Sequence, residues 1–180
     1  MDPATAYVTT SMLKDVLTYG TAKGLRKLSG QRPMAGKTGT TNDYRDAWFI
    51  GYTPQMVTGI WVGYDQPRPG GRGFTGGAVA APIWGSFMRS ALTGRPAADF
   101  PRPDNVVTVT IDPASGYPAT PDCPEKREEE YIAGTEPKEL CPRHGGPPLA
   151  QPATPPPVPV INGPQPAAEA PALPDTSKRP

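Results

Sequence analysis

The 180-residue chain contains 27 Pro and 20 Gly and has a formal net charge of +1. Scattered Lys and Arg at near-neutral charge argue against a nucleic-acid partner, and no run of 18 apolar residues is present to span a membrane. The first residues lack the basic and apolar segments of an export signal. Two Cys in a chain of this length do not make a disulfide scaffold.

The two parts of the chain on either side of residue 100 differ in composition. Residues 1–100 contain 7 Pro, 15 Gly, all three Trp and a net charge of +5, whereas residues 101–180 contain 20 Pro, 5 Gly and a net charge of −4. Residues 147–180 contain 12 Pro and no aromatic side chain, which predicts a disordered tail. We therefore expect a main domain over 1–100, a small module over 101–146 and a disordered Pro-rich tail over 147–180.

The chain begins with a predicted helix over residues 3–19, capped by Asp2 and ended by Gly20. Its expected apolar face consists of Val8, Met12, Leu13, Val16 and Leu17. A polar connector over 23–32 leads to an extended stretch over 33–41. Two strands then follow, Ala47–Tyr52 and Met56–Tyr64, and the short separation between them predicts an antiparallel hairpin.

A Gly-rich loop over 66–77 precedes a second predicted helix near 78–92. Its apolar residues, spaced by four, are Val79, Ile83 and Phe87 on one line and Trp84 and Met88 on another. In the module, Val106–Ile111 alternates as a strand, and Glu128-Glu129-Glu130 indicates a solvated charge run. The order of elements predicts an α+β fold with helices packed on an antiparallel sheet.

The residues most informative about chemistry are Lys37-Thr38-Gly39, followed by Thr40. A Lys-Thr-Gly strand is one of three signatures of the penicilloyl serine transferases. Lys37 supplies a cation near a nucleophile, and Thr38 and Thr40 share one face of an extended strand, where their hydroxyls can bind a carboxylate. Gly39 places no side chain behind the strand, and the Thr40 N–H is a candidate oxyanion donor.

The surroundings of this motif resemble the class A penicillin-binding proteins over residues 2 to about 116. The resemblance rests on Ala35-Gly36-Lys37-Thr38-Gly39-Thr40-Thr41-Asn42-Asp43, Asp46-Ala47-Trp48-Phe49-Ile50-Gly51-Tyr52-Thr53-Pro54, Gly59-Ile60-Trp61-Val62-Gly63-Tyr64-Asp65, Thr75-Gly76-Gly77 and Ala81-Pro82-Ile83-Trp84. It implies part of a β-lactamase/transpeptidase-like fold. It also implies a serine DD-transpeptidase that cross-links peptidoglycan stem peptides outside the cytoplasmic membrane, reacts with β-lactams and uses no cofactor.

Within that resemblance, Lys37 and Thr40 are the expected catalytic residues, and Thr38, Gly39 and Thr40 are expected to bind substrate. The nucleophile is a separate question. Ser11-Met12-Leu13-Lys14 has the Ser-x-x-Lys spacing on a helix. In the family the nucleophile lies well over a hundred residues before Lys-Thr-Gly, so we interpret Ser11 and Lys14 as a decoy and assign no nucleophile.

The residues that resemble the family do not include two of its three catalytic motifs, its glycosyltransferase domain or its membrane anchor. We therefore expect the chain alone to form no stable acyl-enzyme, and the strand over 56–64 to have a bare apolar edge. Two alternatives stay open. The chain is a non-catalytic envelope protein that binds peptidoglycan or a synthase partner, or it complements a separate N-terminal part of the same enzyme.

Cys123 and Cys141 enclose 17 residues, and we predict a disulfide between them. A bridge around such a loop stabilises by about 3 kcal/mol in the chain-entropy description, and the family resemblance places it where disulfides persist. The alternative is a metal cluster of Cys123, Cys141 and His144, for which no Cys-x-x-Cys and no fourth ligand is evident. We predict no metal and interpret His144 as a solvated loop residue.

Overall fold

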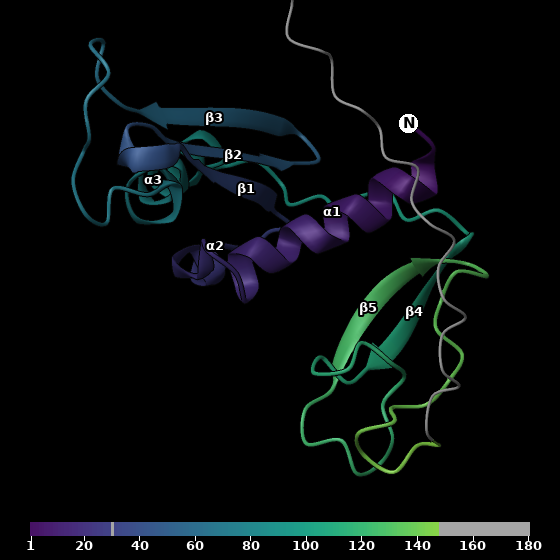
Figure 1. Cartoon of the computed structure of the whole chain (residues 1–180). Coiled ribbons are helices and arrows are strands. Elements are labelled where there is room, and N and C mark those ends of the chain that lie inside the picture. The colour runs from purple at the N-terminus through teal and green to yellow at the C-terminus, as the bar shows by residue number, and fades with distance from the viewer. Residues whose placement is uncertain (30, 148–180) are drawn as a thin grey trace, which may run out of the picture. The chain divides into compact units, whose positions relative to one another are not determined.

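The computed structural model of the chain describes residues 1–29 and 31–147, so the predicted tail, apart from Pro147, lies outside the described residues. The elements of the first hundred residues are α1 (Pro3–Thr18), η1 (Lys23–Leu25), α2 (Arg26–Ser29), β1 (Ala35–Thr40), η2 (Asn42–Tyr44), β2 (Ala47–Thr53), β3 (Met56–Val62), η3 (Gly76–Ala80) and α3 (Ala81–Ala91). They are followed by β4 (Val106–Ile111) and β5 (Arg127–Ile132) (Figure 1).

Helix α1 begins as predicted, because the Asp2 carboxylate accepts a hydrogen bond from Thr5 N–H at 2.9 Å and Pro3 has no backbone N–H that would need an acceptor in the first turn. Its expected apolar face was only partly right. Leu17 is buried in the main core, whereas the side chain of Met12 is more than half exposed. The helix packs on β1, and Thr10 adds a polar contact with the sheet through a 3.0 Å hydrogen bond with Tyr52.

Three antiparallel strands form one sheet in the order β1-β2-β3 (Figure 1). The predicted hairpin is confirmed, with Thr53 opposite Met56 and Trp48 opposite Trp61. Strand β1 lies at one edge and β3 at the other, and no other strand among residues 1–29 and 31–147 pairs with either. The sheet therefore has two open edges.

Helix α3 covers one face of the sheet. Trp84 is fully buried there, packed edge-on against Phe49 with ring centroids 5.1 Å apart, and its indole donates to the Thr58 carbonyl at 3.1 Å. A Cβ on Gly51 would lie 2.6 Å from the Trp84 ring, so glycine is required beneath it. Of the two predicted apolar lines, only the one with Trp84 and Met88 is buried; Ile83 and Phe87 are about half exposed.

Two segments of the first hundred residues differ in detail from the prediction, including the start of the helix predicted near 78–92. The polar connector contains the short helices η1 and α2, since Leu25 turns inward and joins the core. Before α3 the chain forms the π-helical turn η3, which Thr75 caps by accepting a hydrogen bond from Ala78 N–H. This turn brings the backbone of Gly76 close to the sheet.

The module contains a two-stranded antiparallel sheet, β4-β5. Strand β4 is confirmed, but the interpretation of Glu128-Glu129-Glu130 as a solvated charge run is wrong, because these residues form the middle of β5. Glu130 lies opposite Thr108 and accepts from Arg102 at 2.9 Å. Cross-strand partners for its carboxylates thus offset the low strand propensity of Glu.

Within the described residues, no helix is both long and apolar enough to cross a membrane.

Candidate functional site

The Lys-Thr-Gly motif occupies β1, the open edge strand. Lys37 is exposed and lies opposite Ile50 in the β1–β2 register, which places both on the sheet face away from α3. Its ammonium donates to the Thr38 carbonyl at 2.8 Å. The cation is therefore held at the sheet edge, among groups that solvent reaches.

The two threonine hydroxyls lie on the opposite phase of β1 from Lys37, as alternation requires. Thr38 shares a 2.7 Å hydrogen bond with the hydroxyl of Thr21, in the connection after α1. Thr40 accepts from Gly76 N–H at 3.1 Å. Since a hydroxyl is one donor and two acceptors, the Thr40 O–H remains able to donate to a carboxylate. Sequence reasoning gave no role to Thr21 or Gly76.

The direction of the Thr40 N–H follows from the hairpin that joins β1 to β2. Thr41 N–H donates to the Asp46 carbonyl at 3.1 Å, which continues the β1–β2 register by one pair. Successive residues of an antiparallel strand direct their N–H groups alternately toward and away from the partner. The N–H of Thr40 is therefore directed away from β2, toward the open edge.

Close backbone contact fixes the Gly39 segment. A Cβ on Gly76 would lie 2.2 Å from the Trp48 carbonyl oxygen and 2.6 Å from that of Gly39, so η3 sits against β1 and β2 only because Gly76 lacks one. A Cβ on Gly39 would lie 3.2 Å from the Cβ of Trp48. Both glycines thus hold the strand at a spacing that a side chain would widen.

The end of β1 borders a hollow of about 460 Å³, lined by Thr40, Thr41, Asn42, Asp43, Arg45 and Asp46. Two consecutive residues there, Asp43 and Tyr44, have φ angles of 61° and 54°, the left-handed region that non-glycine residues seldom occupy. Asp46 anchors the hairpin by accepting from Trp61 Nε1 at 2.9 Å and from the Thr41 hydroxyl at 3.1 Å. Strain of this kind concentrates at functional sites.

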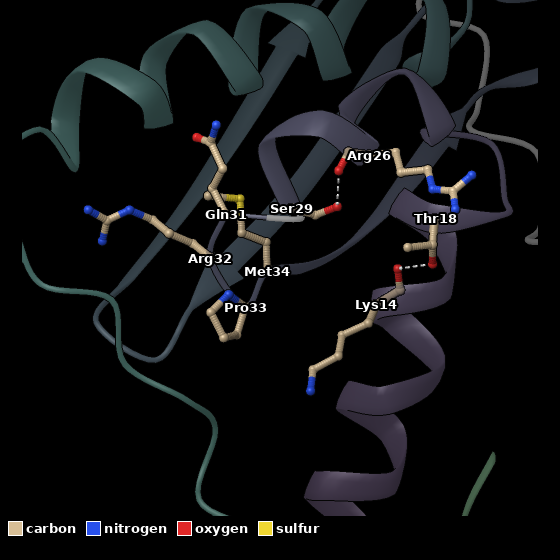
Figure 2. Close-up of a pocket in the computed structure, with 8 residues that line it drawn as sticks. All are labelled: Lys14, Thr18, Arg26, Ser29, Gln31, Arg32, Pro33 and Met34. Carbon is tan, nitrogen blue, oxygen red and sulfur yellow. Dashed lines mark hydrogen bonds between the residues drawn. The ribbon is translucent and has the colours of Figure 1, made fainter. Parts of the chain in front are cut away.

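A second pocket, of about 450 Å³, lies between α1, α2 and the start of β1 and contains Lys14 (Figure 2). Its three cations do not converge. Figure 2 shows the charged groups of Arg26, Arg32 and Lys14 pointing in different directions, and the Arg32 guanidinium donates to the Leu92 carbonyl at 3.0 Å. The pocket therefore offers no concentrated anion site.

Ser11 and Lys14 lie one turn apart on α1, on the helix that packs against β1. The Lys14 ammonium lies 5.2 Å from the ring centroid of Phe100 and 5.6 Å from that of Tyr7. No hydrogen bond joins Ser11 to Lys14 in the part of the chain that the structure describes. The cation is thus engaged with aromatic rings, and its assignment as a decoy stays a prediction.

The predicted disulfide is not formed in the structure, where Cys123 and Cys141 are free and buried. The Cys141 thiol instead donates to the buried Asp112 carboxylate at 3.0 Å. That bond and one from Ala114 N–H lower the pKa of Asp112 to about 2, and the hydrogen bond with Asp112 raises the pKa of His144. His144 therefore belongs to a polar cluster and is not simply a solvated loop residue.

Comparison with known families gives two matches along the chain. Residues 1–89 match the family model described as "Penicillin binding protein transpeptidase domain", and residues 102–146 match "Penicillin-binding protein 1A, C-terminal domain". Among solved structures, the 2.6 Å crystal structure of Penicillin-Binding Protein 1A from Haemophilus influenzae superposes with a TM-score of 0.68 and 32% identity, over 78% of this chain and 22% of that one. The predicted α+β fold is confirmed by this likeness.

Curated relatives agree with these matches. The chain is 48% identical over 125 residues to Penicillin-binding protein 1A of Pseudomonas aeruginosa, which covers 69% of this chain and 15% of the relative. It is 47% identical over 107 residues to the protein of that name from Neisseria lactamica, covering 59% of this chain and 13% of the relative. The chain thus spans a minor part of the length of either relative.

Proposed function

This chain belongs to the class A penicillin-binding proteins, as part of a transpeptidase domain and the small domain after it, and on that premise we propose that β1 forms one wall of a DD-transpeptidase active site. In the proposed reaction a serine attacks the D-Ala-D-Ala end of a peptidoglycan stem peptide. Its hydroxyl oxygen bonds to the carbonyl carbon of the penultimate D-Ala, while the peptide bond to the terminal D-Ala breaks and that residue leaves. An amine on a neighbouring strand of peptidoglycan then takes the acyl group and frees the serine, and β-lactams acylate the same serine. The proposed location is outside the cytoplasmic membrane.

The observation that carries the proposal is the open edge of β1 with the Thr40 N–H directed toward it. A preorganised backbone donor at a position where an oxyanion develops stabilises the transition state without reorganisation. The Thr40 hydroxyl retains its donor for the substrate carboxylate, while Lys37 supplies positive charge at the same edge. Because Gly39 has no side chain, it leaves room for an extended peptide to lie beside β1.

We propose further that the chain contributes no nucleophile and forms no acyl-enzyme alone. Ser11 is placed on α1, and the Lys14 cation next to it lies over the rings of Phe100 and Tyr7. A base needs to reach the proton it removes, directly or through one water. In this proposal the serine that works with Lys37 comes from another part of the transpeptidase domain.

A specific surface favours complementation by such a part. On the sheet face away from α3, four large apolar side chains are between about 40% and 70% exposed: Trp48, Ile50, Val57 and Trp61. Lys37 lies on the same face, opposite Ile50. Neighbouring large apolar side chains that are exposed together are typical of a protein–protein contact surface. We propose that the remainder of the transpeptidase domain covers it.

The test uses fluorescent penicillin, which labels the acyl-enzyme covalently. The full 180-residue chain is mixed with a polypeptide carrying the preceding part of the transpeptidase domain of the Pseudomonas aeruginosa relative. We expect no labelled band from the chain alone and a labelled band on the added polypeptide in the mixture. Lys37→Ala should reduce the labelling rate about 100-fold or more, whereas Lys27→Ala, an exposed lysine of α2, should leave it unchanged.

Three outcomes would contradict the proposal. A covalent band on the chain alone that Ser11→Ala abolishes would make Ser11 the nucleophile. Labelling of the mixture that is equally fast with Lys37→Ala and Lys27→Ala would remove β1 from the active site. Retention of the chain on isolated peptidoglycan, with no labelling of the mixture, would favour the non-catalytic envelope protein instead.

A further inference from the structure

The module over residues 101–146 contains a group of ligand-type side chains that lies apart from the Lys-Thr-Gly strand. Asp112 directly follows β4, Cys123 lies in the loop before β5, and Cys141 and His144 lie in the segment after β5. One carboxylate oxygen, two sulfurs and one imidazole nitrogen all lie within 4.8 Å of one another. Three separate segments of the chain therefore converge at one point.

The distances within this cluster are short. Asp112 Oδ2 lies 3.0 Å from Cys141 Sγ and 2.8 Å from His144 Nδ1, and these last two atoms lie 3.5 Å apart. Asp112, Cys123 and Cys141 are buried, while the His144 side chain is 30% exposed. The imidazole thus presents Nδ1 to the cluster from the solvent side.

We propose that Asp112, Cys123, Cys141 and His144 bind one zinc ion. Two thiolates, an imidazole and a carboxylate are the donors that Zn²⁺ takes in tetrahedral sites, with bonds of about 2.0–2.3 Å. Such bonds put neighbouring ligand atoms roughly 3.3–3.8 Å apart by tetrahedral geometry. The separations of Asp112 Oδ2 from the two neighbouring ligand atoms are below that range, and all four ligand atoms lie within 4.8 Å of one another, so side-chain shifts of about 1 Å suffice.

The groups behind the ligands already have the orientation that a zinc site needs. Asp112 Oδ1 accepts from Ala114 N–H at 2.9 Å, which leaves Oδ2 for the ion. Ser115 Oγ donates to Cys141 Sγ at 3.3 Å, and Thr120 N–H donates to Cys123 Sγ at 3.3 Å. Hydrogen bonds of this kind stabilise thiolates and fix the direction of ligating groups.

Zinc binding replaces bonds that the cluster makes through protons. The Cys141 thiol and the His144 Nδ1–H now donate to Asp112. On binding, both thiols and Nδ1 lose these protons to solvent, so that two thiolates, the Nδ1 of a neutral imidazole and the Asp112 carboxylate coordinate the ion. Four protein ligands leave no open position, so the site is structural. It would tie the end of β4 to the loops on either side of β5.

A disulfide is the competing use of the same cysteines, and the two exclude each other. A bridge consumes both sulfurs and leaves the buried Asp112 carboxylate without the hydrogen bond from the Cys141 thiol, with the partly exposed His144 as its remaining side-chain partner. The direction of the Cys141 thiol toward Asp112 instead of Cys123 favours the metal. The converging Asp112 carboxylate is the fourth ligand that the sequence did not reveal.

The test measures zinc bound to the full 180-residue chain, without an affinity tag, purified with reductant and dialysed after zinc is added. Elemental analysis should give one zinc per chain. Cobalt(II) in place of zinc should give thiolate-to-metal charge-transfer absorption and the visible bands of a tetrahedral site. Asp112→Asn should weaken zinc binding by more than the roughly 10–100-fold that changes behind the ligands cause, and Cys141→Ser by at least as much.

Asp104→Asn is the matched control, because this exposed carboxylate lies in the same module outside the cluster; its zinc content should equal that of the unchanged chain. If Cys141→Ser fails to fold, His144→Ala replaces it, since that side chain is partly exposed. Absence of stoichiometric zinc and of cobalt charge-transfer absorption in the reduced chain would overturn the proposal. So would zinc retained equally by Asp112→Asn and Asp104→Asn.

Discussion

The first hundred residues and the module are held together by different chemistry. The first region buries a continuous apolar core around Leu17, Phe49, Trp84 and Met88. The module buries few large apolar side chains, and its interior instead includes Asp112, Thr120 and the two cysteines. Apolar burial stabilises in proportion to area, whereas buried polar groups stabilise only when every one has a partner.

The length of each region determines how it can be stabilised. A segment of about 45 residues is too short to stabilise itself by apolar burial alone, and units of this size commonly depend on a metal or on cross-links. The first region has a larger core but leaves one sheet face and two strand edges open. The feature of interest therefore differs between the two regions: an exposed sheet face in the first region, and a buried polar cluster in the module.

The largest expected effect tests the apolar core. Trp84→Ala should lower the free energy of unfolding of the first region by about 3–5 kcal/mol, because it removes a fully buried ring together with the indole bond to Thr58. Urea denaturation followed by far-UV circular dichroism measures the change. The control is Trp61→Ala, a side chain 44% exposed on the uncovered face.

Trp61→Ala should cost clearly less, since it loses partial packing and one hydrogen bond with Asp46, worth about 0.5–1.5 kcal/mol. Equal losses for the two substitutions would mean that the uncovered face is as important to folding as the core. The expected difference in stability between the buried core and the uncovered sheet face would then be wrong.

A medium effect tests the close backbone contact that builds the β1 edge. Gly76→Ala should destabilise by roughly 1–3 kcal/mol, because its Cβ would lie 2.2 Å from the Trp48 carbonyl oxygen and force η3 from the sheet. The matched control is Gly24→Ala, whose Cβ would meet nothing within 4 Å. That change should be neutral or slightly stabilising. The melting temperatures of both variants, measured by thermal unfolding in parallel, test this expectation. A destabilised Gly24→Ala with an unaffected Gly76→Ala would contradict it.

Much of the first region is predictable from the sequence, because its signals are local. The Asp2 cap, the alternation of β2 and β3 and the short turn between them each specify a few neighbouring residues. The exposed Ile83 and Phe87 were harder to place, since spacing by four identifies a helical stripe but not which stripe faces the sheet. Trp84 and Met88 are inside because the ring of Trp84 fits over Gly51.

The module was less predictable, because its determinants are distant in the chain. A run of three glutamates has low strand propensity, and β5 forms only because β4 and Arg102 provide partners for it. No local sequence signal connects Asp112 with the cysteines, and only the folded chain brings it to Cys141 and His144. In the same way, Thr21 and Gly76 became part of the β1 site through tertiary contact.

The smallest expected effect concerns the surface pairing of the two module strands. Arg102 donates to Glu130 at 2.9 Å, to the Val106 carbonyl at 3.0 Å and to the Thr108 hydroxyl at 2.9 Å. Its side chain is 40% exposed, and exposed ion pairs contribute only about 0.2–1 kcal/mol. Arg102→Ala should therefore destabilise β5 by about 1 kcal/mol. This is the upper end of the range for an exposed ion pair, because the hydrogen bonds to the Val106 carbonyl and the Thr108 hydroxyl are also lost.

Hydrogen exchange of the β5 amides, followed by mass spectrometry, measures this effect. Tryptophan fluorescence would not report on it, because all three tryptophans lie in the first region. Protection of β5 should fall several-fold in Arg102→Ala and stay unchanged in Arg72→Ala, an exposed arginine of the loop before η3. The difference between the variants should shrink as salt is added, because screening weakens an exposed pair. If Arg102→Ala reduced the protection of β5 as much as Asp112→Asn does, the exposed ion pair would stabilise the module as much as the buried polar cluster. The contrast between the surface and the interior of the module would then not hold.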